Sequence, residues 1–336
     1  MAVAVDDPRF SLRPSFRRRA LNRTFKIATA MTGQISRARL LRDNIEMIRD
    51  LSYGPHPFNK LDVYRPQFAA RPMPVLLYIH GGAFTLCSKD THRGIARASA
   101  WGGQYLVFNI DYRLAPRFQF PCAHEDACAA FVWVAENCAR FGGDPQRIVV
   151  AGESAGGNLA LSVAIAASYK RPESWAKKVF NAKAKIIGVK PIMPYLQVTN
   201  AARQNNNPGA GWLALRAATD IAKAYLGSSR VQPNAQNMMA DPIRILEECG
   251  ASDKPFPSVF SGVGTWDVCC EDVQRLERAC ERLGVPAEMH YYQREIHAFH
   301  VFAWRENARL YWSQAFTFLR KTAAVHTPAL SLEVPA

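Results

Sequence analysis

Residues 147–158, with the sequence RIVVAGESAGGN, constrain this chain more than any other stretch. The apolar run 148–151 predicts a buried strand, and the apolar run 159–168 predicts a helix shortly after it. Between them lies a Gly-x-Ser-x-Gly turn, where a serine nucleophile must point out of a sharp, strained bend that the glycines leave room for. The start of the helix would aim free backbone amides at the same point and stabilise an oxyanion there. Ser154 is therefore a candidate nucleophile.

The pentapeptide alone is a weak signal. Glycine makes up roughly 7% of residues and serine is about as common, so the pattern arises by chance in roughly one chain in ten of this length. A serine hydroxyl also needs a base, a residue that orients the base, and donors for the oxyanion. The interpretation therefore depends on whether such partners follow elsewhere in the right order.

Strands and helices alternate along most of the chain. Besides 148–151, the apolar runs predict strands at 45–53, 59–64, 75–79, 105–110, 184–189, 258–263 and 287–292. Besides 159–168, helices are predicted at 91–101, 123–140, 272–283 and 306–322. This alternation predicts an α/β fold with a mostly parallel sheet covered by helices on both faces. Residues 45–196 and 241–322 would form that catalytic domain.

Three segments break the alternation. Residues 1–44 carry apolar side chains three or four positions apart from residue 16 onward, which predicts a helical lid segment. Residues 197–240 are rich in Asn and Gln around an apolar helical piece at 212–226, and we interpret them as a lid insertion. The tail 323–336, with two prolines, is predicted to be disordered.

The positive charge is concentrated in the N-terminal segment. Residues 9–42 hold ten Lys and Arg and no acidic residue, so only about +4 (14 − 10) of the net charge of +14 belongs to the rest of the chain. We interpret the segment as a lid helix with solvated arginines, and the alternatives are a helix on a membrane surface or a transit peptide. Aromatic residues are sparse among these charges, so we expect no nucleic-acid partner.

Composition places the chain among soluble proteins, with 49% hydrophobic and 21% charged residues. The sequence contains no apolar run long enough to span a membrane. The apolar start, residues 1–5, is too short for a signal peptide, so we expect a cytoplasmic protein. The eight cysteines lie in apolar or helical stretches without Cys-x-x-Cys pairs, which favours buried thiols over disulfides or a metal site.

Two polar residues follow later strands of the predicted sheet. The strand 258–263 leads to Asp267, and the strand 287–292 leads to His297. Because parallel strands share their carboxyl ends, both residues should reach the same edge of the sheet as Ser154. We therefore predict Asp267 as the acid and His297 as the base, in the order serine, acid, histidine.

Other residues compete for these two roles. Asp267 could be an ordinary loop or helix-capping aspartate, but Glu271 and Asp272 suit the capping role better. His300 is the rival base, and we expect it to pack behind the site. The remaining histidines that we interpret as structural or surface residues are His56, His80, His92, His124 and His290.

Donors for an oxyanion are predicted from backbone amides. His80-Gly-Gly82 follows a buried strand about seventy residues before Ser154, and glycines let their bare N–H groups approach a substrate closely. The alternative is an ordinary tight turn. We predict an oxyanion hole formed by the amides of Gly81, Gly82 and Ala155.

Six motifs together resemble those of the hormone-sensitive lipase family of α/β-hydrolase carboxylesterases, over roughly residues 45–320. They are HGGAF at 80–84, DYRLAP at 111–116, GGDP at 142–145, GESAGG at 152–157, GTWD at 264–267 and HAF at 297–299. The resemblance implies an α/β-hydrolase fold with an eight-stranded sheet, a helical lid and hydrolysis of carboxylic esters with short to medium acyl chains. It also gives the triad roles to Ser154, Asp267 and His297. No metal or cofactor is required by this chemistry.

The sequence departs from the family pattern at three places. Ala298 stands where the family usually has glycine, Arg117 stands where an acid is usual, and residues 268–272 lack the usual leucine. None of these changes removes a catalytic group. They bear on the subfamily and on the substrate.

Several alternatives stay open. An amidase such as an arylformamidase uses the same triad, and related small-molecule receptors lack the histidine that His297 supplies here. A lipase held on anionic lipid by the basic arm is a third possibility. Candidate walls of the substrate pocket are Phe84, Trp212 and Phe299, although they suit the core equally well, and a homodimer could form along the edge strand 287–292.

Overall fold

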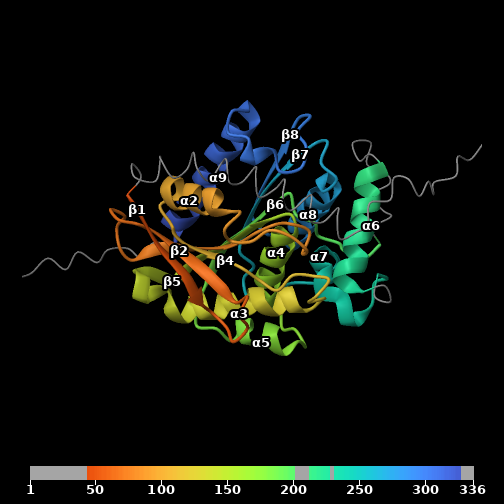
Figure 1. Ribbon diagram of the computed structural model, residues 1–336, viewed down its shortest axis with the longest axis horizontal. Helices are drawn as coiled ribbons and strands as arrows, with labels where there is room; N and C mark the ends of the chain where they lie inside the picture. Colours follow the sequence, from red (N-terminus) through yellow and green to blue (C-terminus); the bar gives the residue numbers. More distant parts are fainter. Residues whose placement is uncertain (1–43, 201–211, 228–230, 327–336) are drawn as a thin grey trace, which may run out of the picture.

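The computed structural model describes residues 44–200, 212–227 and 231–326, which form an eight-stranded sheet between two layers of helices (Figure 1). The strand order is β1-β2-β4-β3-β5-β6-β7-β8. The strands are β1 (Ile45–Ser52), β2 (Lys60–Pro66), β3 (Met73–Ile79), β4 (Leu106–Ile110), β5 (Gly143–Glu153), β6 (Ile186–Ile192), β7 (Ser258–Gly264) and β8 (Ala287–Tyr292).

The sheet is parallel except at one edge. β1 and β2 form an antiparallel hairpin, and β2 also pairs antiparallel with β4, whereas every pair from β4 to β8 is parallel. Parallel neighbours need a crossover connection, which explains why helices separate these strands in the sequence. The predicted mostly parallel, eight-stranded sheet is therefore confirmed, and the carboxyl ends of β3 and β5 to β8 share one edge.

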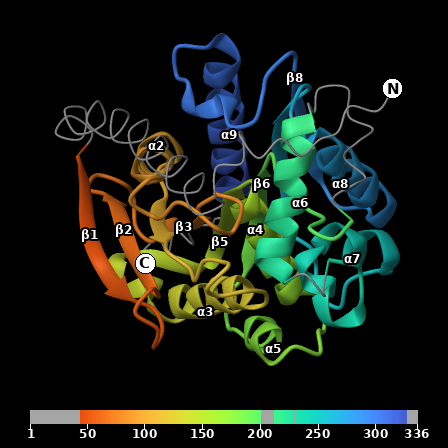
Figure 2. The same ribbon diagram turned by 45° about the vertical axis from the view of Figure 1, so that its right-hand side comes forward.

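Helices cover both faces of the sheet (Figure 2). One face packs against α2 (Arg93–Gly103) and α9 (Glu306–Val325). The other face packs against α3 (Cys122–Asn137), α4 (Ala155–Ser168) and α8 (Cys270–Leu283). Alternate side chains of β3 enter the two cores, with Leu77 on the side of α4 and Tyr78 on the side of α9. Burial on both faces explains the continuous apolar runs of the central strands.

The predicted elements differ from the structure mainly at their ends. The helix predicted at 123–140 ends at Asn137 and continues as the 3-10 turn Cys138–Phe141. The last helix runs to Val325, so the first residues of the predicted disordered tail are helical. Two helices were not predicted at all, α5 (Ser174–Phe180) and α7 (Pro242–Glu248). Each has only seven residues, too few to show a clear helical period.

The predicted basic lid segment lies outside the described residues except for Asn44, as do residues 201–211, 228–230 and 327–336. Of the lid insertion, the structure describes α6 (Trp212–Leu226) and the 3-10 helix Ala235–Ala240. The buried carboxylate of Asp241 joins the two ends of the insertion, accepting hydrogen bonds from Val198 N at 2.7 Å and Thr199 N at 3.0 Å. The insertion therefore leaves and re-enters the domain at one point.

Candidate active site

Ser154 occupies the bend between β5 and α4. Its backbone has φ 53° and ψ −118°, which is outside the regions that residues with a side chain normally adopt. A Cβ atom on Gly152 would lie 2.3 Å from the carbonyl oxygen of Gly156, and one on Gly156 would lie 2.1 Å from the carbonyl oxygen of Ile79. Both flanking glycines are therefore required by close backbone packing, as the motif predicts.

Asp267 and His297 come together from loops that follow β7 and β8. Nδ1 of His297 lies 2.9 Å from both carboxylate oxygens of Asp267. The backbone N–H of Cys269 also donates to Asp267 Oδ1 at 2.8 Å, which helps to hold the carboxylate in place. Asp267 is only 1% exposed, whereas the side chain of His297 is 40% exposed. The imidazole is thus held by one nitrogen while part of the ring stays open to solvent.

The environment of His297 favours its charged form. Burial lowers the pKa of the imidazole, but the neighbouring Asp267 carboxylate more than offsets this, so the pKa of His297 is raised above its ordinary value of 6.5. A raised pKa makes the imidazole a better proton acceptor. It suits a residue that must take a proton from a weakly acidic hydroxyl.

The loop of His297 is tied to the bend that carries Ser154. The N–H of Ser154 donates to the carbonyl of Ile192 at 2.9 Å. The next residue, Met193, accepts from the N–H of Ala298 through its sulfur at 3.0 Å. Ala298 has φ 62°, so the position where the family usually has glycine keeps a left-handed backbone. The end of β6 therefore joins the chain at Ser154 to the residue after His297.

A second carboxylate–histidine cluster lies buried beneath the bend. Glu153 Oε2 accepts a hydrogen bond from Tyr78 at 2.7 Å and lies 3.1 Å from Nε2 of His300. Its other oxygen is bonded to Nε2 of His92. Gly81 also packs against it, since a Cβ atom there would lie 2.8 Å from Glu153 Cγ. One carboxylate thus joins β3, the start of α2, the loop of Gly81 and the loop of His297.

The histidines of this cluster keep the carboxylate charged. Burial alone would raise the pKa of Glu153, but His92 and His300 hold it well below its ordinary value. Conversely, burial lowers the pKa of His92, and Glu153 more than reverses this, so the pKa of His92 is raised.

Lys190 on β6 is also fully buried, 3.3 Å from the hydroxyl of Tyr311, and burial lowers its pKa to about 8.

The glycines predicted for an oxyanion hole, Gly81 and Gly82, follow the end of β3 after a single residue, His80. Gly82 has φ +111°, and its carbonyl accepts from Leu86 N at 2.9 Å, which folds the loop back on itself. Phe84 is fully buried and stacks on Tyr225 of α6, with ring centroids 3.9 Å apart and planes 5° from parallel. The mid-chain insertion therefore supports the loop from outside. The third predicted donor, Ala155, is the first residue of α4.

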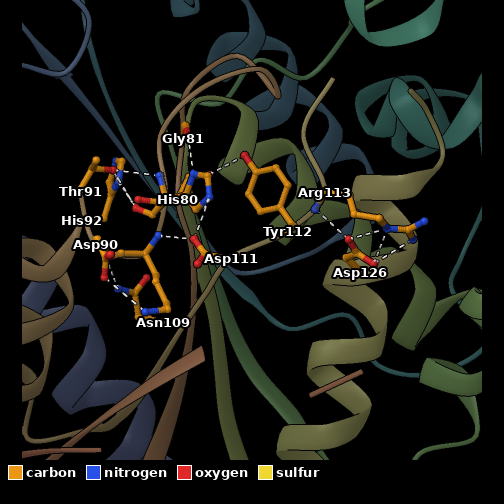
Figure 3. Close-up of polar contacts among 12 residues, drawn as sticks. His80, Gly81, Asp90, Thr91, His92, Asn109, Asp111, Tyr112, Arg113 and Asp126 are labelled. Carbon is orange, nitrogen blue, oxygen red and sulfur yellow. Dashed lines mark hydrogen bonds and ion pairs between the residues drawn. The ribbon is translucent and has the colours of Figure 1, made fainter. Parts of the chain in front are cut away.

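His80 and Asp111 support this loop from below (Figure 3). The ring of His80 stacks on Tyr112, whose hydroxyl donates to the carbonyl of His80 at 3.0 Å. Burial lowers the pKa of His80 to about 3 and raises that of Asp111 to about 6. Asp111 Oδ1 accepts from the backbone N–H of Lys89 at 2.7 Å. These contacts hold the loop in position.

The remaining sequence-based expectations have mixed outcomes. His300 packs behind the site, as expected of the rival base. The expected capping role of Asp272 is wrong, because its buried carboxylate accepts from Leu196 N at 2.8 Å and α8 has no side-chain cap. Phe299 is fully buried against Tyr292, so its role as a pocket wall stays a prediction, like that of Phe84. Trp212 begins α6, and its side chain lies outside the described residues.

The arrangement of sheet, bend and loops agrees with a comparison against protein families. A family model described as "alpha/beta hydrolase fold" matches residues 76–301. The chain belongs to the alpha/beta hydrolase fold family. The resemblance to the hormone-sensitive lipase family is also confirmed, because the chain is 38% identical over 104 residues to hormone-sensitive lipase of Bos taurus, a match that covers 31% of this chain and 14% of that relative.

Curated relatives and solved structures of this α/β hydrolase family carry esterase names. The chain is 41% identical over 152 residues to carboxylesterase NlhH and 31% identical over 227 residues to esterase LipI, both of Mycobacterium tuberculosis. These matches cover 42% and 67% of this chain but only 48% and 65% of the relatives. An esterase structure from Pyrobaculum calidifontis has a TM-score of 0.72 at 26% identity, over 94% of each chain. Among the described residues, no helix is long and apolar enough to cross a membrane.

Proposed function

We propose that this protein is a serine carboxylesterase in which Ser154 is the nucleophile, His297 the base and Asp267 the residue that orients the base. The observation that carries the proposal is the Asp267–His297 pair, held at 2.9 Å and tied to the strained bend at Ser154. The names of the relatives support an ester as substrate. A short to medium acyl chain is the finer part of the proposal and rests on the family resemblance.

The first half of the reaction forms an acyl-enzyme. Ser154 Oγ attacks the ester carbonyl carbon while its proton passes to Nε2 of His297. Asp267 stabilises the imidazolium through Nδ1–H and keeps the ring in the tautomer that leaves Nε2 free to accept. The carbonyl oxygen becomes an oxyanion, which the amides of Gly81, Gly82 and Ala155 stabilise by hydrogen bonds. Collapse of the intermediate breaks the ester bond, and the proton on Nε2 leaves with the alcohol.

The second half returns the enzyme to its starting state. A water molecule gives a proton to Nε2 of His297 and attacks the acyl carbon, forming a second oxyanion on the same amides. The bond to Ser154 Oγ then breaks, the proton passes from Nε2 back to Oγ, and a carboxylic acid is released. The partly exposed imidazole lets water reach this position.

The lid is proposed from the same resemblance. Residues 197–240, whose two ends are joined by Asp241, would cover the pocket together with residues 1–44. The catalytic domain beneath this lid would consist of residues 45–196 and 241–322. A cytoplasmic location fits the eight cysteines, all of which are free thiols in the structure. β8 is an edge strand, and a homodimer would form along it.

Hydrolysis of p-nitrophenyl esters of increasing acyl length tests the proposal directly. We expect the highest kcat/KM with short to medium chains and no detectable hydrolysis by the Ser154→Ala variant. Activity that rises steadily with chain length would favour a lipase. A folded wild-type protein that cleaves no ester but cleaves a formamide would contradict the esterase proposal and support the amidase alternative.

A further inference from the structure

The thiol of Cys269 lies beside the Asp267–His297 pair. One carboxylate oxygen of Asp267, the sulfur of Cys269 and one ring nitrogen of His297 all lie within 4.8 Å of one another. No other three His, Cys, Asp or Glu side chains gather this closely in the part of the chain that the structure describes. Cys269 is anchored at this place, because its N–H donates to Asp267 Oδ1 at 2.8 Å and it directly precedes α8.

This donor set suits a soft divalent cation. Zn²⁺ binds oxygen and nitrogen at about 2.0–2.2 Å and sulfur at about 2.3 Å, so tetrahedral ligands on one ion lie about 3.3–3.6 Å apart. The nitrogen and oxygen of the pair are 2.9 Å apart, so they would have to separate by about 0.5 Å, and the sulfur would have to approach by about 1 Å. Mg²⁺ and Ca²⁺ take oxygen ligands and do not favour a thiolate. Three protein ligands leave a fourth position for water.

We propose that Asp267, Cys269 and His297 form an inhibitory site for a thiophilic divalent cation such as Zn²⁺ or Cd²⁺. The inference rests on the proposed function for its effect on activity, although binding itself does not depend on it. Asp267 and Cys269 are buried, and the cation would enter past the imidazole of His297, whose side chain is 40% exposed.

Binding would stop catalysis by moving one proton. The cation forms bonds to the Asp267 carboxylate, to Cys269 as thiolate and to Nδ1 of His297. The thiol proton is released to solvent, and the proton that Nδ1 carried moves to Nε2, so the imidazole stays neutral. An Nε2 that carries a proton cannot accept one from Ser154. Substrate can still bind, so kcat should fall while KM stays unchanged.

Titration of esterase activity with CdCl₂ tests the inhibition. The wild-type protein is compared with Cys269→Ala and Cys269→Ser, and each variant is scaled to its own activity without cadmium. Removing one of three ligands should raise the cadmium concentration for half-inhibition on the order of 100-fold in both variants, since even outer-shell changes cost 10–100-fold. Addition of EDTA should restore the wild-type rate, and MgCl₂ should not inhibit.

Two other cysteines serve as matched controls. Cys270 is the next residue in the chain, and Cys87 is a partly exposed thiol whose Cβ would lie 3.0 Å from a Cβ atom on Gly82. Cys270→Ala and Cys87→Ala should keep the wild-type sensitivity. Sensitivity that persists in both Cys269 variants, that disappears in Cys87→Ala, or that acts by raising KM would overturn the proposal.

Direct binding separates this inference from the proposed function. The ultraviolet charge-transfer band of a cadmium–thiolate bond should appear in the wild-type protein and in Cys270→Ala. In Cys269→Ala the intensity of the band should fall by one cadmium–thiolate bond per protein molecule. Circular dichroism checks that each variant is folded. If this difference is seen in a protein that hydrolyses no ester, the site stands and the esterase proposal fails. If it is absent while esters are hydrolysed, the site alone fails.

Discussion

Two carboxylate–histidine clusters are connected to the bend at Ser154, and they differ in their contact with solvent. In the first, Asp267 is buried and holds a single histidine whose side chain is 40% exposed. In the second, Glu153 holds two histidines, His92 and His300, and all three are buried. The chemical groups are the same. The clusters differ in which ring nitrogen binds the carboxylate and in whether the rest of the ring is exposed.

That difference separates the proposed base, His297, from histidines that only position the loops. His297 binds its carboxylate through Nδ1, which leaves Nε2 for proton transfer. His92 and His300 bind Glu153 through Nε2, the nitrogen that a base would use, and no part of either ring lies open to substrate. The first cluster can do chemistry, and the second can only hold the loops of Ser154, Gly81 and His297 in place.

Loss of the nucleophile should have the largest effect. Ser154→Ala removes the atom that attacks the carbonyl, so kcat should fall on the order of 10⁴ to 10⁶ with little change in the folded state. Stopped or continuous assay of a p-nitrophenyl ester, with circular dichroism for folding, measures this. A variant that kept more than about one hundredth of the wild-type kcat would show that the bend is not the reacting site.

Neutralising the carboxylate of the first cluster should cause the second-largest loss of kcat. Asp267→Asn keeps the shape but favours the wrong imidazole tautomer, so we expect kcat to fall by about 10⁴, with a much smaller loss of stability. Asp253→Asn, at a solvent-exposed aspartate, is the matched control and should leave kcat unchanged. If Asp267→Asn were as active as this control, Asp267 would not be the residue that orients His297.

Neutralising the second cluster should give the opposite pattern. Glu153→Gln leaves two buried histidines without their charged partner, so the free energy of unfolding should fall by about 3 kcal/mol. We expect kcat to fall only about tenfold, through misplaced loops. Chemical denaturation and steady-state kinetics measure the two effects. Glu288→Gln, at an exposed pair with Lys321, should change stability by less than about 0.5 kcal/mol.

If Glu153→Gln lost as much kcat as Asp267→Asn, the distinction between the two clusters would no longer hold. The same would follow from a Glu153→Gln variant that is as stable as the wild type. Either result would mean that Glu153 acts on the reacting groups directly or that its charge is not needed for the fold.

The clusters should also differ in their response to pH. The base must be neutral, and the pKa of His297 is raised, so kcat/KM should fall as pH decreases through a value above 6.5. The pKa of Glu153 is lowered, so its charge adds stability that is fully present above pH 4.5 and is lost as pH falls through the lower folded-state value. The stability gap between wild type and Glu153→Gln should therefore narrow in acid, and the part that depends on charged His92, whose pKa is raised above 6.5, should be lost as pH rises through that raised value. A pH–rate limb below 6.5 would argue against the Asp267–His297 pair.

The sequence was enough to predict that Asp267 and His297 meet, which the structure shows, but it did not predict the contacts of Glu153. The bend at Ser154 could be predicted because it needs a local pattern of glycines between a strand and a helix. Asp267 and His297 could be found because they follow consecutive strands, whose carboxyl ends meet at one edge. Both signals are short in sequence and follow from the geometry of a parallel sheet.

Glu153 could not be assigned a role in this way. Its partners Tyr78, His92 and His300 lie 75, 61 and 147 residues away, on three different elements, and no spacing rule connects them. His92 and His300 could only be classed as structural, without their shared carboxylate. The support of the Gly82 loop by Tyr225 of α6 is hidden for the same reason, because it depends on how an insertion folds back over the sheet.

The most direct test of the account is covalent labelling of the folded protein with an active-site-directed fluorophosphonate, followed by peptide mapping. Only a serine whose proton is accepted by a neighbouring base reacts quickly with such a reagent. We predict a single modified residue, Ser154, with labelling largely lost in His297→Gln but retained in Glu153→Gln. Ester hydrolysis without modification of Ser154, or labelling that is as fast in His297→Gln as in the wild type, would contradict the account.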